Sequence, residues 1–204
     1  MNFLAHLYLS GDDSNIRIGN FIGDYVKGRR HEQYSYSIQQ GIILHRKIDS
    51  FTDSHQLFKQ SGSRFKPKFN RYSGVVNDLV YDHLLASSWN KYSSQSLKMF
   101  ASGVHKLLIQ NYFLLPMEVK QFLPFLIKNR RLESYQTLQG LDNALRIMVK
   151  HAGIPDHIDF LIEVLQANYE LFEQEFAVFM DEVKRMVVHE LISIDQLRPI
   201  SDGL

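Results

Sequence analysis

Apolar side chains recur every three or four residues along most of the chain, which is the spacing of an α-helix that buries one face. The segment SNIRIGNFIGDYVKG, residues 14–28, has this spacing and ends at a glycine. The same spacing predicts a second helix over 37–58 and a third over 75–92. Between them, the segment 61–74 is basic and rich in turn-forming residues, so it is predicted to be a connection. Further helices are predicted at 94–114, 116–128, 131–151 and 155–192.

Together, these predicted helices indicate an all-α protein. Hydrophobic residues are 45% of the chain and aromatic residues 12%, which is enough to build a sizeable core. The last predicted helix carries a stripe of aromatic residues that we expect to pack in this core. No internal repeat, low-complexity segment or change in composition marks a linker. We therefore expect a single helical domain over residues 1–204.

The composition limits the cellular setting and the types of site. The chain has no cysteine, which excludes disulfides and thiolate metal sites and fits a reducing compartment. The segment MNFLAHLYLSGDD lacks the basic region and the cleavage site of a signal peptide. No uncharged apolar run approaches the roughly 18 residues that span a bilayer. We expect a cytoplasmic protein with no membrane partner.

The net charge is only +1, but it is unevenly distributed. Residues 1–75 hold 11 Lys and Arg against 6 Asp and Glu, and residues 76–155 hold 9 against 5. Residues 156–204 hold 3 against 11. A basic first part can attract an anionic partner to one face of the molecule. Chance clustering of charges on solvated helix faces explains the same pattern equally well.

Four segments in the first 90 residues place His or Asp among apolar neighbours: NFLAHLYLS, GNFIGDYVKG, LHRKIDSFTD and NDLVYDHLLASSW. Side chains four residues apart share one face of a helix. His45 and Asp49 are therefore predicted neighbours, and so are Asp78 and Asp82. The complete set of candidates is His6, Asp24, His45, Asp49, Asp53, Asp78, Asp82 and His83.

Imidazole and carboxylate groups without thiolate are ligands for Mn²⁺, Mg²⁺, Fe²⁺ or Zn²⁺ in hydrolytic sites. Arg46, next to His45, could hold a phosphate oxygen through its planar guanidinium. Each candidate alone has a simpler explanation, such as a hydrogen-bonded core histidine or a charge pair on a helix surface. Their joint occurrence favours a metal-dependent hydrolase, because buried charged groups need partners or an ion.

The segments MNFLAHLYLS, GNFIGDYVKG, GIILHRKIDSFTDSH and DLVYDHLLASSW resemble, in order and spacing, the motifs of the acyl carrier protein phosphodiesterase family. The motifs cover roughly the first 90 residues, and the rest matches as a helical continuation. The resemblance implies a helical fold distantly related to the HD-domain metal phosphohydrolases. The implied reaction hydrolyses the phosphodiester that joins 4′-phosphopantetheine to a serine of holo-acyl carrier protein. The products are apo-acyl carrier protein and free 4′-phosphopantetheine.

The resemblance also implies a divalent cation, typically Mn²⁺, with Mg²⁺ or Fe²⁺ as alternatives. HD-domain enzymes are named for a His-Asp doublet, whereas this chain has Asp82-His83 in the reverse order. The division between metal ligands and supporting residues therefore stays open. By position, the implied metal-centre candidates are His6, Asp24, His45, Asp49, Asp82 and His83, and the implied catalytic candidates are Arg46, Asp53 and Asp78.

The implied partner is holo-acyl carrier protein, a small acidic helical protein, and no nucleic acid is expected. Basic residues at 27–30, at 64–71 and at 128–131 could form a complementary docking face, and such pairing weakens as salt rises. Two alternatives remain from the sequence. One is an HD-type phosphohydrolase that acts on a small nucleotide, and the other is a non-catalytic helical binding module.

Overall fold

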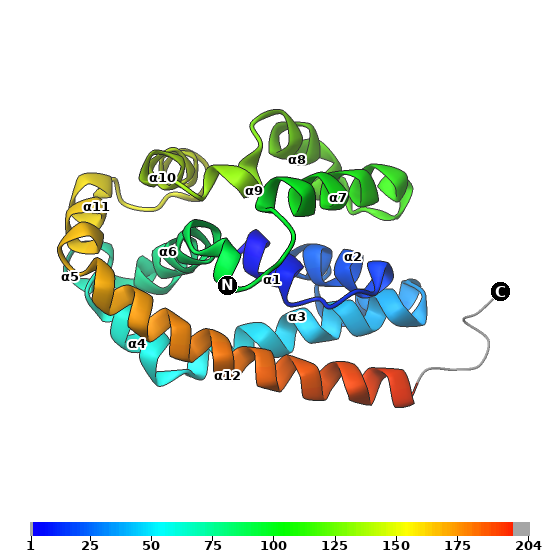
Figure 1. Ribbon diagram of the computed structural model, residues 1–204. Coiled ribbons are helices and arrows are strands. Elements are labelled where there is room, and N and C mark those ends of the chain that lie inside the picture. The colour runs from blue at the N-terminus through cyan, green and yellow to red at the C-terminus, as the bar shows by residue number, and fades with distance from the viewer. Residues whose placement is uncertain (1, 198–204) are drawn as a thin grey trace.

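The structure is a computed structural model that describes residues 2–197, and these residues form helices and connections without a strand (Figure 1). The 3₁₀ helices are η1 (Gly23–Tyr25), η2 (Gly28–Gln33), η3 (Asn70–Tyr72), η4 (Trp89–Lys91) and η5 (Tyr112–Leu114). The α-helices are α1 (Phe3–Tyr8), α2 (Ser14–Ile22), α3 (Tyr36–Ser54), α4 (Gln56–Ser63), α5 (Lys66–Phe69), α6 (Ser73–Ser87), α7 (Leu97–Gln110), α8 (Met117–Lys128), α9 (Arg131–Ser134), α10 (Leu138–Ala152), α11 (Ile158–Ala167) and α12 (Tyr169–Gln196).

The short helix α1 lies at the centre of the molecule, between α2, α3 and α6, while the long helix α12 crosses in front of α3 and α4 (Figure 1). Leu4, Ala5 and Leu7 of α1 are fully buried. Helix α1 therefore belongs to the core, and its side chain His6 is buried with these residues. Within the described part, none of the helices has the length and apolar character needed to cross a bilayer.

Helices α2 and α3 touch at their backbones because two glycines face each other. A Cβ atom on Gly19 would lie 2.1 Å from the carbonyl oxygen of Ile38, and one on Gly41 would lie 2.2 Å from that of Ile16. Any larger residue at either position would force the helices apart. This close approach brings the end of α2 and the following η1 beside the middle of α3.

The predicted helix over 37–58 is two helices in the structure. His55 is extended, with φ −67° and ψ 130°, so α3 ends at Ser54 and α4 begins one residue later. The segment 61–74, predicted to be a connection, contains the end of α4 as well as α5 and η3. Pro67 stands in the first turn of α5, where it needs no helical hydrogen bond. Phe65 and Phe69 are fully buried and fix this basic segment to the core.

Two other predicted helices are also broken. The predicted helix over 131–151 is α9 and α10, since Thr137 is extended and its hydroxyl accepts from the amide of Gly140 at 3.1 Å to start α10. The predicted helix over 155–192 is α11 and α12, which part at Asn168. The predicted aromatic core stripe of this last segment is confirmed, because Phe172, Phe176 and Phe179 are buried.

Candidate metal centre

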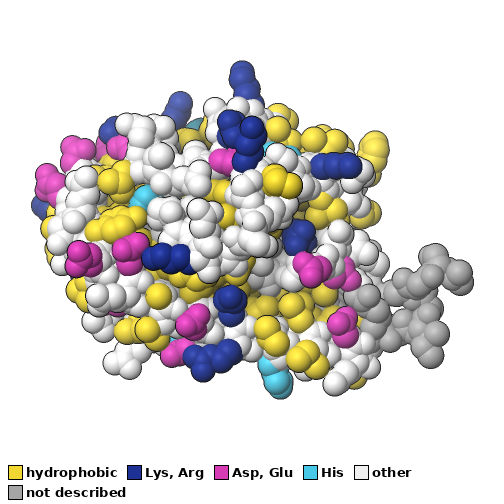
Figure 2. Space-filling model, in the orientation of Figure 1, with side chains coloured by type: hydrophobic (Ala, Val, Ile, Leu, Met, Phe, Trp, Pro, Cys, Tyr) yellow, Lys and Arg dark blue, Asp and Glu magenta, His cyan; other side chains and the backbone are white. Residues whose placement is uncertain are grey.

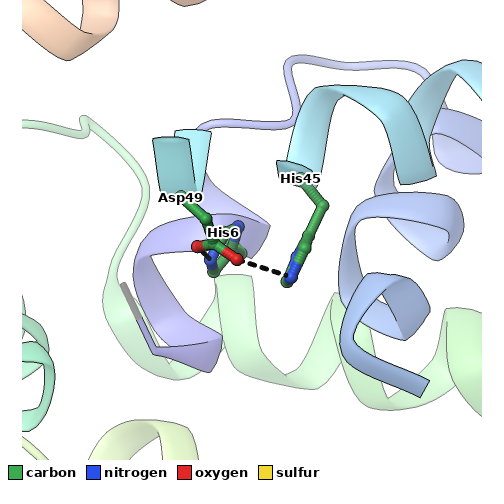
Figure 3. A group of neighbouring side chains, drawn as sticks. All are labelled: His6, His45 and Asp49. Carbon is green, nitrogen blue, oxygen red and sulfur yellow. Dashed lines mark hydrogen bonds and ion pairs between the residues drawn. The ribbon is translucent and has the colours of Figure 1, made fainter. Parts of the chain in front are cut away.

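Helices α1 and α3 bring two His side chains and one Asp side chain to one place (Figure 3). His6 comes from α1, while His45 and Asp49 lie one turn apart on α3. Nε2 of His6 is 3.0 Å from Oδ1 of Asp49, and Nε2 of His45 is 3.1 Å from Oδ2 of Asp49. One possible ligand atom from each of these residues lies within 4.8 Å of the others. Asp24 in η1 adds a second carboxylate, 3.4 Å from Nε2 of His45.

The buried side chain and backbone of Asn20 set the orientation of both imidazole rings. Its Nδ2 donates to the carbonyl oxygen of His6 at 2.9 Å and to Oγ of Ser10 at 3.0 Å, so its Oδ1 must be an acceptor. Nδ1 of His6 therefore carries a hydrogen and donates to this Oδ1 at 2.8 Å. Nδ1 of His45 donates to the backbone oxygen of Asn20, also at 2.8 Å. In neutral rings, both Nε2 atoms then present lone pairs to the carboxylates.

The two histidines have very different pKa values. Burial lowers the pKa of His6 to about 4, although the contact with Asp49 acts in the opposite direction. Burial also disfavours charge on His45, but the carboxylates of Asp24 and Asp49 outweigh it and raise that pKa to about 9. Burial would raise the pKa of Asp49, yet its contacts with the two histidines hold it well below the usual range. The contact with His45 likewise lowers the pKa of Asp24.

The group fits a divalent cation. Near neutral pH, His6 is uncharged, so its Nε2 lone pair faces an ionised carboxylate oxygen at 3.0 Å without a hydrogen between them. Nε2 of His45 is buried and makes no well-aligned hydrogen bond. Near neutral pH the positive charge among these acceptors is the proton on His45, whose pKa is about 9. A divalent cation could replace that proton, and two imidazoles with carboxylates suit Mn²⁺, Fe²⁺ or Zn²⁺. Asn20 supplies the hydrogen bonds that orient histidine ligands in such sites.

Local features of η1 and α3 make this approach possible. A Cβ atom on Gly23 would lie 2.3 Å from Cγ of His45, so only glycine lets η1 pass so close to the ring. Arg46, the predicted phosphate-binding residue, donates from Nη2 to the carbonyl oxygens of Val26 at 2.8 Å and Gly28 at 2.9 Å. It thereby fastens the loop after η1 to the helix that carries His45.

Asp82 and His83, the other predicted metal-centre candidates, lie outside this group. The carboxylate of Asp82 accepts from the backbone amides of Leu4 at 2.9 Å and Ala5 at 3.0 Å, so it anchors the first turn of α1. Burial nevertheless raises the pKa of Asp82 to about 7.

His83 points away from α1, towards the segments after α9 and α11. Its Nδ1 is 2.8 Å from the carbonyl oxygen of Tyr135, and its Nε2 is 3.1 Å from the hydroxyl of Tyr169. The structure therefore brings four of the six predicted metal-centre residues together and gives Asp82 and His83 other contacts.

The two predicted supporting acids have different surroundings. Burial raises the pKa of Asp78 to about 6, and the charges of Asp49 and Asp53 act in the same direction. Asp78 is therefore close enough to the group to sense Asp49. Asp53 is exposed one turn after Asp49 and lines a shallow groove of about 340 Å³ with Lys59 and Lys66.

Asn20 is the residue of the centre that sequence reasoning missed. Its sequence signal was available, because Asn20 stands four residues before Asp24 inside the apolar helix pattern of GNFIGD. An amide on a buried helix face needs hydrogen-bond partners, and here the partners of the side chain are His6 and Ser10.

The chain is similar to proteins of known name. The model of the family described as acyl carrier protein phosphodiesterase matches residues 1–183. A Photorhabdus laumondii protein of that name is 28% identical over 180 residues, which cover 88% of this chain and 87% of the relative. A Klebsiella pneumoniae protein of the same name is 28% identical over 190 residues, covering 91% and 97%. No solved structure matches the chain, so the relation to the HD-domain fold stays a prediction.

Proposed function

The chain belongs to the acyl carrier protein phosphodiesterase family of enzymes, and we propose that it hydrolyses the phosphodiester of holo-acyl carrier protein in a metal-dependent reaction. Water attacks phosphorus, the bond to the serine oxygen breaks, and that oxygen takes a proton. The products are apo-acyl carrier protein and 4′-phosphopantetheine. The observation that supports metal dependence is the convergence of His6, His45 and Asp49, which bring one possible ligand atom each within 4.8 Å of the others.

We assign His6, His45 and Asp49 as the metal ligands, with Asp24 as a further ligand at the exposed edge. The proposed ion is Mn²⁺, with Mg²⁺ or Fe²⁺ as alternatives. Such an ion acidifies water and neutralises charge on phosphate oxygens. Asn20 keeps both imidazoles turned so that Nε2 faces the centre.

The charge state of Asp24 suits its role as a ligand, and other side chains would contact the phosphate. The lowered pKa of Asp24 keeps it ionised at neutral pH, as a carboxylate ligand must be. The two hydrogens of Nη2 of Arg46 are used on the loop, which leaves Nη1 and Nε as the atoms that can contact phosphate. The supporting acids are Asp78, whose pKa burial raises to about 6, and Asp53, which is exposed one turn after Asp49.

The test is to incubate the purified protein with holo-acyl carrier protein and follow the mass of the carrier. With Mn²⁺ we expect loss of the phosphopantetheine arm, and with a chelator or the His45→Ala variant we expect none. An unchanged carrier mass with Mn²⁺, Mg²⁺ and Fe²⁺ alike would contradict the proposal. Faster turnover of a small nucleotide than of the carrier would favour the nucleotide alternative instead.

A further inference from the structure

A groove of about 610 Å³ lies between the η1–η2 segment and the turn that joins η5 to α8. This volume is typical of sites that enclose most of a small ligand. Side chains from both segments line it, among them Tyr25 and Tyr34 on one side and Leu115 and Met117 on the other.

The groove is connected to the candidate metal centre through η1 and the residue that follows it. Tyr25 lines it and directly follows Asp24 in η1. Arg46, which follows His45, binds the carbonyl oxygen of Val26 in the groove wall. The ring of Tyr25 lies with its centroid 5.7 Å from that of Phe122 in α8, and Glu118 of the first turn of α8 lines the same groove, so α8 packs against Tyr25. One loop therefore forms both the edge of the centre and a wall of the groove.

The lining combines apolar and hydrogen-bonding groups. Val26, Ile38 and Leu115 offer apolar contact, while Tyr34 and Ser35 offer hydroxyl groups. This mixture suits an extended chain in which methyl and methylene groups alternate with amides. It suits a planar aromatic or a highly charged ligand less well, because few charged side chains line the groove.

The rim of the groove carries apolar side chains that stand in water. Phe113 is 91% exposed and Met117 is 64% exposed. Figure 2 shows hydrophobic side chains gathered over the ends of α7 and α8. Exposed apolar surface beside a groove is typical of a binding site. On the opposite side, Lys27 and Arg30 are exposed, so an acidic protein would find positive charge at the mouth.

We propose that this groove binds the pantetheine arm of the carrier-protein substrate while the phosphodiester lies at the metal centre. The inference rests on the proposed function, which supplies the substrate. Pantetheine is an uncharged chain with a dimethyl-bearing carbon, two amides and a terminal thiol, and these groups match a lining that offers both apolar contact and hydroxyl groups. A phosphate held beside Asp24 would direct the attached arm past Tyr25 into the groove. The body of the carrier protein then lies outside, next to Lys27 and Arg30.

Two variants test the groove directly. Ser35→Trp places an indole in the groove, and Ser35 makes no side-chain cap at the start of α3 that would be lost. Met117→Glu places a charge at the rim. The matched control is Met99→Glu, because Met99 is 62% exposed, nearly the same as Met117, and does not line the groove. Thermal melting of each variant checks that the fold is kept.

Three readouts are compared: hydrolysis of holo-acyl carrier protein, Mn²⁺-dependent hydrolysis of bis(4-nitrophenyl) phosphate, and inhibition by free pantetheine. We expect the ratio of carrier to nitrophenyl turnover to fall by about tenfold in Ser35→Trp and Met117→Glu. Inhibition by pantetheine should weaken by a similar factor. Met99→Glu should match the wild type in all three measurements.

Other outcomes overturn the inference in distinguishable ways. Wild-type turnover ratios in both groove variants, or no inhibition of the wild type by pantetheine, would show that the arm binds elsewhere. Loss of carrier hydrolysis with undiminished pantetheine inhibition would assign the groove to the carrier protein's body. If the wild type cleaves the nitrophenyl diester but not the carrier protein, the proposed function is wrong. The inference about the groove, which rests on it, is then wrong as well.

Discussion

His6 and His45 stack with ring centroids 4.0 Å apart, yet they hold protons very differently. His45 is next to two carboxylates, whereas His6 is more deeply enclosed and shares Asp49 with its neighbour. Burial lowers the pKa of His6, whereas the neighbouring carboxylates raise the pKa of His45 despite its burial. A cation that binds both Nε2 atoms must therefore displace a proton from His45 but not from His6.

Metal binding should release close to one proton at neutral pH, because His45 has a pKa of about 9 and must lose its proton to become a ligand. The Mn²⁺ affinity should rise by up to about tenfold per pH unit as pH increases from 7 towards 9. Calorimetric titration in buffers of different ionisation enthalpy measures the proton count. Binding without proton release would show that His45 is not a ligand.

The same shift has a consequence for the metal-free protein. The pKa of His45 is raised from 6.5 to about 9 by folding. The contribution of His45 to stability is therefore complete below pH 6.5 and is lost as pH rises through 9.

Asn20→Ala should lower Mn²⁺ affinity by about 10- to 100-fold, which is the usual effect of removing a hydrogen bond that orients a histidine ligand. The substitution leaves Nδ1 of His6 without its acceptor and removes the donor to Ser10. Asn15→Ala is the matched control, because Asn15 is exposed on the same helix. Equal Mn²⁺ affinities of the two variants, measured by calorimetry, would exclude an orienting role for Asn20.

At the scale of elements, the centre depends on how α1, α2 and α3 meet. Helix α1 has only six residues, too few to be stable alone, and the carboxylate of Asp82 holds its first turn from α6. Helices α2 and α3 touch through Gly19 and Gly41. These contacts place His6 and Asp24 on opposite sides of the α3 row that carries His45 and Asp49.

Gly41→Ala should lower the free energy of unfolding by about 1–3 kcal/mol and weaken Mn²⁺ binding, because the added methyl would lie 2.2 Å from the carbonyl oxygen of Ile16 and separate α2 from α3. The control is Gly103→Ala in α7, where nothing lies within 4 Å of the new Cβ. That change should raise stability by about 0.5–1 kcal/mol. Urea unfolding measures both, and a stable Gly41→Ala variant with normal Mn²⁺ affinity would contradict this view of the interface.

At the scale of the whole molecule, the basic segments serve two purposes. Arg64 donates hydrogen bonds from Nη1 and Nη2 to the buried carboxylate of Glu175, at 2.8 and 2.7 Å. Its charge is therefore used within the fold. Arg130 is paired with Glu133 at 3.0 Å. Lys27 and Arg30 are exposed, and Arg30 lines the groove, so the η1–η2 segment supplies exposed positive charge on this side of the molecule.

Arg30→Glu should raise KM for holo-acyl carrier protein by about tenfold at low salt, because it places a like charge next to an acidic partner. The difference from the wild type should shrink as salt screens the charges. Lys150→Glu on α10 makes the same change in net charge away from the groove and serves as the control. Steady-state kinetics at two salt concentrations measure the effect, and equal KM values for the two variants would show that docking does not use the η1–η2 segment.

The sequence by itself determined the helical class, the aromatic core stripe and the pairing of His45 with Asp49. Each follows from spacing within one helix, where the backbone fixes which side chains share a face. Helix ends were less predictable, because the breaks at His55, Thr137 and Asn168 are single backbone conformations within apolar patterns that continue across them.

The tertiary structure alone decided which helices meet. It joined His6 and Asp24 to the α3 row, gave Asn20 its orienting role, and turned Asp82 and His83 to other partners. Spacing along the chain carries no information on contacts between helices. Those contacts depend on close packing at positions such as Gly19 and Gly41, where one missing side chain allows two backbones to touch.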